Sequence, residues 1–164
     1  MDQLKVNSDI VIANREGKPA VESYQYIVIR LGEEQYGIDI RYVENIVRMQ
    51  NITRVPKVPA YLKGVINLRG EVIPVVSIRL KMGLSENEAT RTTRIIILKT
   101  ETSGNLGIVV DEVREVVTLK EDNIERVTRE TGDGRTRFIN GIGKHGNELI
   151  SLLELSSITL DENA

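Results

Sequence analysis

Residue types that could carry out covalent or acid–base chemistry are scarce in this chain. It has no cysteine and one histidine, His145, which excludes thiolate metal sites, Cys–His nucleophiles and the histidine clusters that bind zinc. His145 follows a β-prone run and precedes a glycine, so we expect a solvated turn residue there. Carboxylates are plentiful, but none of the following belongs to a motif that fixes its partner: Asp39, Glu44, Asp111, Glu112 and Glu115.

Sequence motifs of common active sites are missing as well. The chain contains no G-x-S-x-G nucleophile turn, no H-E-x-x-H zinc motif and no P-loop. Gly141 and Gly143 stand close together but do not lead into a helical pattern, so a phosphate-binding loop is not expected. We therefore predict that the protein is not an enzyme and that it binds no metal and no cofactor.

The residue best placed for a directed contact is Arg69, in the run GVINLRGEVIPVVSI over residues 64–78. The apolar, β-prone stretches on either side predict a hairpin, with Gly70 adopting a positive φ in the tight connection. Arg69 then stands at the tip, where its planar guanidinium could bind a carboxylate of a partner through two hydrogen bonds. The alternative is that a polar residue only keeps the turn soluble, and this stretch on its own leaves both possibilities open.

Length and charge narrow the function classes further. The chain has 164 residues, enough for one ordinary domain or for two small lobes that support each other. Its net charge is −2 with 28% charged residues, so it lacks the clearly basic balance that nucleic-acid binding selects. The N-terminus has no secretory signal pattern, and no apolar stretch reaches the roughly 18 residues of a membrane span. We therefore expect a soluble, cytoplasmic protein without membrane insertion.

The predicted fold class is mainly β. The chain has no tryptophan and one phenylalanine, so its core must be aliphatic, and the β-branched residues isoleucine and valine that dominate it favour strands. Residues 41–48 have apolar side chains three and four apart, which favours one or two helical turns. Residues 1–22 are expected to be a flexible arm and residues 160–164 a tail. The other predicted segments are a hairpin over 24–40, an extended stretch over 51–59, a second hairpin over 64–80 and a polar connector over 83–93.

The second half of the chain repeats the first. Residues 36–46 align without a gap over residues 106–116, and residues 64–78 align over residues 141–155. Any two β hairpins share some of this pattern, but four matched elements in the same order favour an internal duplication. Two similar lobes of about five strands follow, each able to close into a small barrel, built from consecutive strands or by exchange between the halves. Within them we assign structural turns to Gly70, Gly107 and Gly141.

In these stretches the chain resembles the CheW family of chemotaxis coupling proteins. The resemblance rests on KGVINLRGEVIPVVSIR with the preceding RVPKVPAYL, on the upstream YGIDI and on the later GIVVDEVREVV, and it extends from about Tyr24 to Ile158. It implies two five-stranded SH3-like barrels around a shared core over residues 23–159, and no enzymatic activity. It also implies a protein, monomeric when free, that binds the regulatory domain of a CheA-type histidine kinase and the cytoplasmic tips of chemoreceptors, and is recruited to membrane-associated receptor arrays.

The same resemblance points to partner-binding residues. The arginine of N-L-R-G, here Arg69, is implicated in partner binding in this family. The segment after Y-G-I-D-I also contributes, often as V-x-E-I, whereas in this chain Asn45 stands at the glutamate position and Glu44 carries the acid. Val113 and Val116 match receptor-facing positions, although spacing alone would place one of them in the core. The full predicted set is Val43, Glu44, Asn45, Ile46, Gly64, Arg69, Val113 and Val116.

Two other possibilities compete with a separate adaptor. A CheW-like regulatory module can be part of a kinase or of a CheV-type protein with a receiver domain, but 164 residues leave no room for either. A small β-barrel module of another pathway, such as one that binds oligonucleotides, would need exposed aromatics beside basic residues. The chain has five tyrosines, one phenylalanine and a net negative charge. We therefore expect a separate, non-catalytic adaptor.

Deleting residues 1–20 should leave the fold almost as stable as before, because this segment has no sustained apolar periodicity with which to pack. We expect the melting temperature to move by only about one or two degrees, since 1 kcal/mol corresponds to roughly 2–4 °C at this size. Melting followed by circular dichroism, for the truncated and the full chain, measures the difference. A loss of about 10 °C would show instead that the segment packs as a strand.

Overall fold

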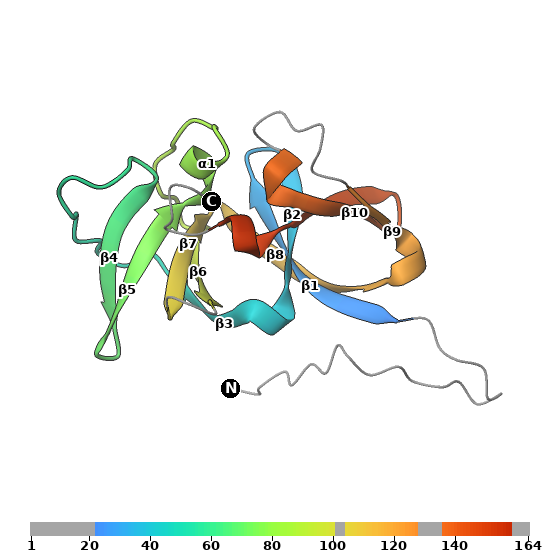
Figure 1. The fold of residues 1–164 in the computed structure, drawn as a ribbon, viewed down its shortest axis with the longest axis horizontal. Coiled ribbons are helices and arrows are strands. Elements are labelled where there is room, and N and C mark those ends of the chain that lie inside the picture. Colours follow the sequence, from blue (N-terminus) through green and yellow to red (C-terminus); the bar gives the residue numbers. More distant parts are fainter. Residues whose placement is uncertain (1–21, 101–103, 128–135, 159–164) are drawn as a thin grey trace.

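The structure is a computed structural model that describes residues 22–100, 104–127 and 136–158. The predicted N-terminal arm, apart from Glu22, and the predicted C-terminal tail lie outside the described residues. Strands make up most of the described part, and none of its helices is both long and apolar enough to cross a membrane. The predicted mainly β class with short helical turns is confirmed (Figure 1).

Short strands follow one another through tight turns and short loops. The strands are β1 (Ser23–Leu31), β2 (Glu34–Asp39), β3 (Val43–Arg48), β4 (Leu62–Leu68), β5 (Glu71–Ser77), β6 (Arg94–Lys99), β7 (Asn105–Val110), β8 (Glu112–Lys120), β9 (Ile124–Arg126), β10 (Ile139–His145) and β11 (Glu148–Leu153). The helical elements are α1 (Ile78–Lys81) and the 3-10 turns η1 (Ile40–Tyr42), η2 (Glu121–Asn123), η4 (Thr136–Phe138) and η5 (Leu155–Ser157).

The strands form two sheets, which we call the first and the second lobe (Figure 1). The first lobe has the strand order β3-β6-β7-β5-β4, and the second has the order β8-β1-β2-β11-β10-β9. Each lobe therefore takes one hairpin, β6–β7 or β1–β2, from one half of the chain and its remaining strands from the other half. The lobes are built by exchange between the halves, which the sequence left open. The second lobe adds a short sixth strand, β9, to the five expected.

The joints between the halves are parallel strand pairs at equivalent positions of the repeat. In the first lobe Val75 of β5 pairs with Gly107 of β7, and in the second lobe Leu152 of β11 pairs with Gly37 of β2. A Cβ atom at Gly107 would lie 2.9 Å from Ile95 Cγ2, and one at Gly37 would lie 2.9 Å from Leu152 Cδ2. The missing side chains let the core approach the backbone closely at both joints.

The prediction that Gly107 and Gly141 form turns is wrong. They lie within strands, in β7 and β10 respectively. A Cβ atom at Gly141 would come within 3.2 Å of the carbonyl oxygen of Glu125, on the neighbouring strand β9. These two glycines therefore serve close packing, whereas Gly70, with a φ of 84°, does lie in a tight turn.

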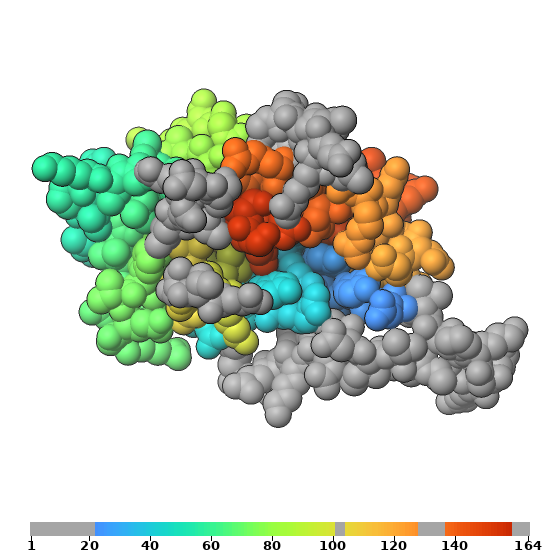
Figure 2. Space-filling view, viewed as in Figure 1, coloured from blue at the N-terminus to red at the C-terminus, as the bar shows by residue number. Residues whose placement is uncertain are grey.

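Strands β1 and β6 bury both of their faces and so link the two lobes. Along β1, Tyr26 and Val28 fill the second lobe, while the residues that alternate with them enter a core shared by both sheets. Strand β6 divides in the same way between the first lobe and the shared core. The lobes meet at the centre of the face shown in Figure 2, where the segments carrying η1 and η5 lie. The shared core includes Ile27, Ile29, Leu31, Ile96, Leu98, Ile108 and Val110.

Residues 41–48, predicted as helical turns, are mostly a strand. Only η1 is helical, and Asp39 caps it by accepting a hydrogen bond from the backbone N–H of Arg41 at 3.0 Å. Strand β3 then pairs antiparallel with β6, and its side chains alternate between half-buried and exposed. Pairing with β6 imposes this alternation of side chains, which has a period of two residues. The spacing of Val43, Ile46 and Val47, three and four residues apart, had favoured a helix instead.

Gly64 is buried where the loop before β4 runs alongside that strand. Thr53 and Val65 exchange two backbone hydrogen bonds, each of 2.8 Å, across this contact. Gly64 has a φ of 145°, and a Cβ atom there would lie 2.1 Å from the carbonyl oxygen of Thr53. The contact is between backbones, so no rotation of a side chain can relieve it.

Gly64→Ala should lower the free energy of unfolding by about 3 kcal/mol or more, because backbone must move to admit the methyl group. Gly70→Ala is the matched control, since its φ is 84° but its Cβ would meet nothing within 4 Å. The free energy of unfolding of that variant should fall by only the roughly 1–2 kcal/mol that a non-glycine residue costs in the left-handed conformation. Urea denaturation of both variants measures the losses, and equal losses would contradict this account.

Candidate functional site

The hairpin of β4 and β5 presents Arg69 on a two-residue turn. Arg69 and Gly70 have positive φ values of 54° and 84°, between the closing pair Leu68 and Glu71. The backbone N–H of Gly70 donates to Asn67 Oδ1 at 3.1 Å. Positive φ at both central residues is typical of a type I′ turn, which matches the twist of the strands it joins. The turn thus holds Arg69 in a conformation that costs a non-glycine residue roughly 1–2 kcal/mol.

The guanidinium of Arg69 is exposed and has no ion-pair or hydrogen-bond partner in the part of the chain that the structure describes. Val72, three residues along the same hairpin, is 63% exposed. Glu71 is engaged elsewhere, because it accepts a hydrogen bond from Asn105 Nδ2 at 3.2 Å. An available cation close to an exposed valine can bind a partner's carboxylate while the partner covers the apolar side chain.

The predicted residues at the start of β3 have different environments. Val43 is half-buried and packs against the shared core. Glu44 is exposed, with its Oε2 3.5 Å from Lys99 Nζ on β6. Asn45 Oδ1 accepts a hydrogen bond from the backbone N–H of Ile46 at 2.8 Å, and Ile46 itself is 37% exposed. The acid of this segment is therefore paired with Lys99, and Ile46 is the exposed large apolar residue of β3.

The two predicted valines of β8 also divide between core and surface. Val113 is half-buried against the shared core, whereas Val116 is 45% exposed. Val116 and Ile46 occupy equivalent positions of the repeat. Among the described strands, β3 pairs with β6 alone and β8 with β1 alone, so both residues lie on an edge strand. Each lobe thus exposes one aliphatic side chain along an edge.

Sequence reasoning missed two exposed apolar residues at the hairpins. Val72 of β5 is 63% exposed and Leu149 of β11 is 66% exposed, again at equivalent positions of the repeat. The signal was present in the strand alternation. Ile73 and Ile150 are buried in their lobes, so the residue before each of them must point outward.

The structure spreads the predicted residues over three places. Arg69 lies at the tip of the β4–β5 hairpin of the first lobe, residues 43–46 lie on the first lobe's edge strand, and Val113 and Val116 lie in the second lobe (Figure 1). Gly64 belongs to none of these surfaces, because it is buried beneath the backbone of Thr53. Its role in the fold is structural.

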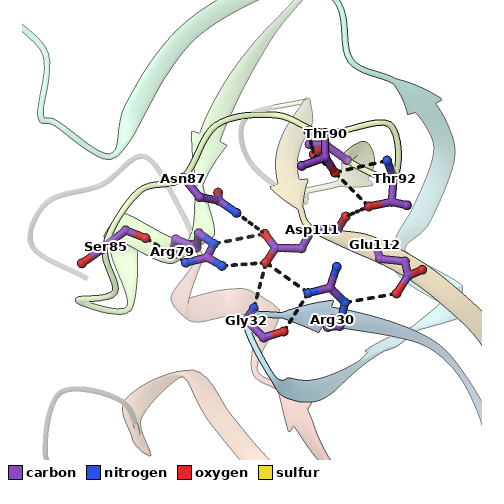
Figure 3. A network of polar contacts seen from close by, with 10 residues as sticks. Arg30, Gly32, Arg79, Ser85, Asn87, Thr90, Thr92, Asp111 and Glu112 are labelled. Atoms are coloured by element: carbon purple, nitrogen blue, oxygen red, sulfur yellow. Dashed lines mark hydrogen bonds and ion pairs between the residues drawn. The ribbon is translucent and has the colours of Figure 1, made fainter.

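Asp111 joins the two lobes at the point where the chain passes from β7 to β8 (Figure 3). Its side chain is 9% exposed. The carboxylate accepts hydrogen bonds from Arg79 Nε at 3.0 Å and Nη2 at 2.6 Å, and from the backbone N–H of Gly32 at 2.8 Å. Arg79 belongs to α1 beside the first lobe, and Gly32 to the turn between β1 and β2 of the second. One carboxylate therefore bonds to both lobes.

Two further groups lie close to the Asp111 carboxylate, and the contacts of this network determine the pKa of Asp111. Asn87 Nδ2 donates to Asp111 at 3.4 Å, and Arg30 Nη1 lies 3.8 Å from the same carboxylate. Burial by itself would raise the pKa of Asp111, but the hydrogen bonds from Arg79 and from the N–H of Gly32 outweigh it and hold that pKa below its ordinary value. The same pairing raises the pKa of Arg79. Asp111 is thus ionised at neutral pH and fixes the start of β8.

The described residues contain no cluster of side chains suited to a metal ion. No group of histidine, cysteine, aspartate and glutamate among them is arranged to hold a metal ion. His145 ends β10 and is exposed. What these residues do offer is exposed charge and exposed aliphatic side chains on a rigid frame, which suits contacts with other proteins.

Comparison with known proteins shows which family the chain resembles. The profile of the CheW-like domain matches residues 25–162. The chain is 35% identical over 138 residues to the chemotaxis protein CheW of Bacillus subtilis, covering 84% of this chain and 88% of that protein. It is 34% identical over 137 residues to CheW of Helicobacter pylori, covering 84% and 82%. The crystal structure of the scaffolding protein TtCheW from Thermoanaerobacter tengcongensis matches with a TM-score of 0.73 at 31% identity, covering 87% of this chain and 90% of that one.

Asp111→Asn should lower the free energy of unfolding by about 1.5–3 kcal/mol at neutral pH, the range for hydrogen bonds to a charged group. The loss should depend on pH. Because the folded-state pKa lies below the unfolded value of about 3.9, the stabilisation is fully present above that value and is lost as the pH falls through the folded pKa. The stability difference between parent and variant should therefore be constant from neutral pH down to about pH 5 and shrink below about pH 4.

Urea denaturation across this pH range measures the difference. Glu112→Gln is the control, because that carboxylate bonds to Arg30 at 3.1 Å but its side chain is 34% exposed. Glu112→Gln should lower the free energy of unfolding by about 1 kcal/mol or less. A difference for Asp111→Asn that does not change with pH would show that its charge is not what joins the lobes.

Proposed function

The chain belongs to the CheW family, whose members are non-catalytic scaffold proteins of chemotaxis. We therefore propose that it couples the cytoplasmic tips of chemoreceptors to the regulatory domain of a CheA-type histidine kinase. In this proposal it has no enzymatic activity, acts in the cytoplasm and is recruited to receptor arrays at the membrane. The observation that carries the proposal is Arg69, which has a strained φ on the hairpin of the first lobe and no partner among the described residues.

The equivalent turn of the second lobe supports a binding role for Arg69. There the matching position is Gly146, with a φ of 61° close to the 54° of Arg69. Glycine adopts this conformation without strain, so the turn itself does not require an arginine. A strained residue that the local geometry does not need is typical of a functional site.

The separation of the predicted surfaces also suits coupling. The β4–β5 hairpin with Arg69 and Val72 belongs to the first lobe, whereas Val116 lies on β8 of the second lobe. Two partners can therefore bind at the same time without competing for one surface. We assign Val116 to the receptor-facing side and assign Arg69 to a partner that carries an exposed carboxylate.

Arg69→Ala should weaken binding of one partner by about 1–3 kcal/mol, the range for a charged hydrogen bond with some lost packing. Arg69→Lys should recover only part of that loss, because it keeps the charge but not the planar fork. Both variants should melt like the parent, since arginine, lysine and alanine meet the same strain at this φ. Titration calorimetry against the kinase regulatory domain and against a receptor fragment, in separate experiments, shows which partner Arg69 serves.

Arg91→Ala is the matched control, because Arg91 is also exposed but lies in the connector before β6. It should leave both affinities within about 0.5 kcal/mol of the parent, as surface substitutions usually do. If both partners bind Arg69→Ala as tightly as the parent, the arginine only keeps the turn soluble.

A further inference from the structure

The segment from the end of β3 to the β4–β5 turn is basic throughout. Residues 47–70 contain five lysines and arginines but no aspartate or glutamate, although the whole chain has a net charge of −2. These cations are Arg48, Arg54, Lys57, Lys63 and Arg69. The corresponding residues of the second half, 117–147, contain six lysines and arginines together with five acids. The repeated pattern of strands therefore does not require an excess of positive charge at this place.

Three of these cations lie along one edge of the first lobe. Strand β4 is at the edge of its sheet, and the loop before it runs alongside through the hydrogen bonds between Thr53 and Val65. Arg54 and Lys57 are exposed in this loop, and Arg69 is exposed in the turn after β4. We call these three residues the basic edge. The loop and the turn lie at opposite ends of β4 (Figure 1).

No carboxylate neutralises the basic edge within the part of the chain that the structure describes. Lys63, inside β4, pairs with Glu86 of the connector before β6. The three residues of the basic edge make no ion pair and no side-chain hydrogen bond with described residues. Val55, which lies within the same loop, is 37% exposed. The edge thus offers positive charge beside an exposed aliphatic side chain, to which an acidic protein surface is complementary.

Lys57 is held in a strained conformation, as Arg69 is. Among the described residues these two are the non-glycine residues with positive φ, at 60° and 54°. Pro56 and Lys57 form the centre of a turn. A proline followed by a residue of positive φ is typical of a type II turn, which favours glycine or asparagine at that second position. A lysine is strained there, and residues in such conformations cluster at functional sites.

The backbone of the turn at Lys57 is fixed on both sides. Before the turn, Thr53 and Val65 exchange their two hydrogen bonds of 2.8 Å. After it, the backbone N–H of Leu62 donates to the carbonyl oxygen of Pro59 at 3.0 Å. A cation on a fixed turn requires less ordering of the chain when it binds, which lowers the entropic cost of the contact.

We propose that the basic edge is one continuous binding surface for an acidic protein, and that Lys57 and Arg69 contact the same partner. This partner is the one that the proposed function assigns to Arg69, so the shared surface rests on that function. Strand β4 has seven residues and spans about 20 Å. An interface of standard size, about 800 Å² on each partner, is about 30 Å across and covers both ends of the strand.

Titration calorimetry of the full chain against the kinase regulatory domain and against a receptor fragment tests the proposal. Lys57→Gly removes the charge and the strain together, whereas Lys57→Glu reverses the charge. For the partner that Arg69→Ala weakens, Lys57→Gly should weaken binding about three- to tenfold and Lys57→Glu about tenfold or more, as expected for a charge within an interface. The other partner should bind both variants within about twofold of the parent.

The same variants separate a binding role from a structural one. Lys57→Gly should melt at or above the temperature of the parent, because glycine adopts this φ without strain. The double variant with Arg69→Ala should weaken binding by about the product of the two single effects, since side chains this far apart act independently. A loss of affinity without a loss of stability assigns Lys57 to binding.

Arg91→Glu is the matched control. It changes the net charge of the chain as much as Lys57→Glu does, but it lies in the connector before β6, outside the basic edge. It should leave both affinities within about twofold of the parent. The comparison separates a contact made by Lys57 from a general effect of charge.

Either of two results would overturn the shared surface alone. In the first, the partner that Arg69→Ala weakens binds both Lys57 variants as tightly as it binds Arg91→Glu, and the proposed function still stands. In the second, the Lys57 variants weaken only the partner that Arg69→Ala leaves unchanged. If neither partner binds the parent, or if Arg69→Ala weakens neither, the proposed function and the shared surface both fail.

Discussion

Burial of both faces of β1 and β6 is the constraint on which the rest of the structure depends. In a sheet with one wet face, polar and apolar residues alternate along a strand, whereas here each strand places alternate aliphatic side chains in its own lobe and in the shared core. Both cores can form only when each hairpin is inserted into strands from the other half of the chain. Neither half can therefore complete a lobe alone, and the lobes cannot separate without exposing the shared core to water.

Polar contacts reinforce this exchange at its joints. Gln35 Nε2 donates to Glu148 at 2.6 Å in the second lobe, and Asn105 Nδ2 donates to Glu71 at 3.2 Å in the first. These four residues occupy equivalent positions of the repeat, so each lobe has an amide from one half bonded to a carboxylate from the other. Asp111 adds a contact with no such counterpart among the described residues, because it bonds to both lobes at once. Directional bonds of this kind select one register for strands that packing alone would admit in several.

The rigid frame explains how a small protein can present separate binding surfaces. The two matched stretches of the sequence have outward-facing apolar residues at the same places, Ile46 with Val116 and Val72 with Leu149. The hairpin tips then differ, because the first carries Arg69 where the second carries a glycine. Charge at one tip distinguishes the two hairpins, and charge complementarity contributes more to the choice of partner than to raw affinity.

Local features of this protein were determined by its sequence alone. The β class follows from isoleucine and valine content, and the tight turn at Gly70 from its flanking strands. Each of these features depends on residues that are neighbours along the chain. Side-chain alternation within a strand and the preference of glycine for positive φ are properties of such short segments.

Only the tertiary structure decided the contacts between distant segments. These include the exchange of hairpins, the strand at β3 in place of helical turns, and the packing roles of Gly107 and Gly141 inside strands. They also include the pairing of Glu44 with Lys99 and the bonds of Asp111 to both lobes. The physical reason is that strand pairing and core packing join residues tens of positions apart, and aliphatic runs of similar composition satisfy several such pairings equally well until the whole core is assembled.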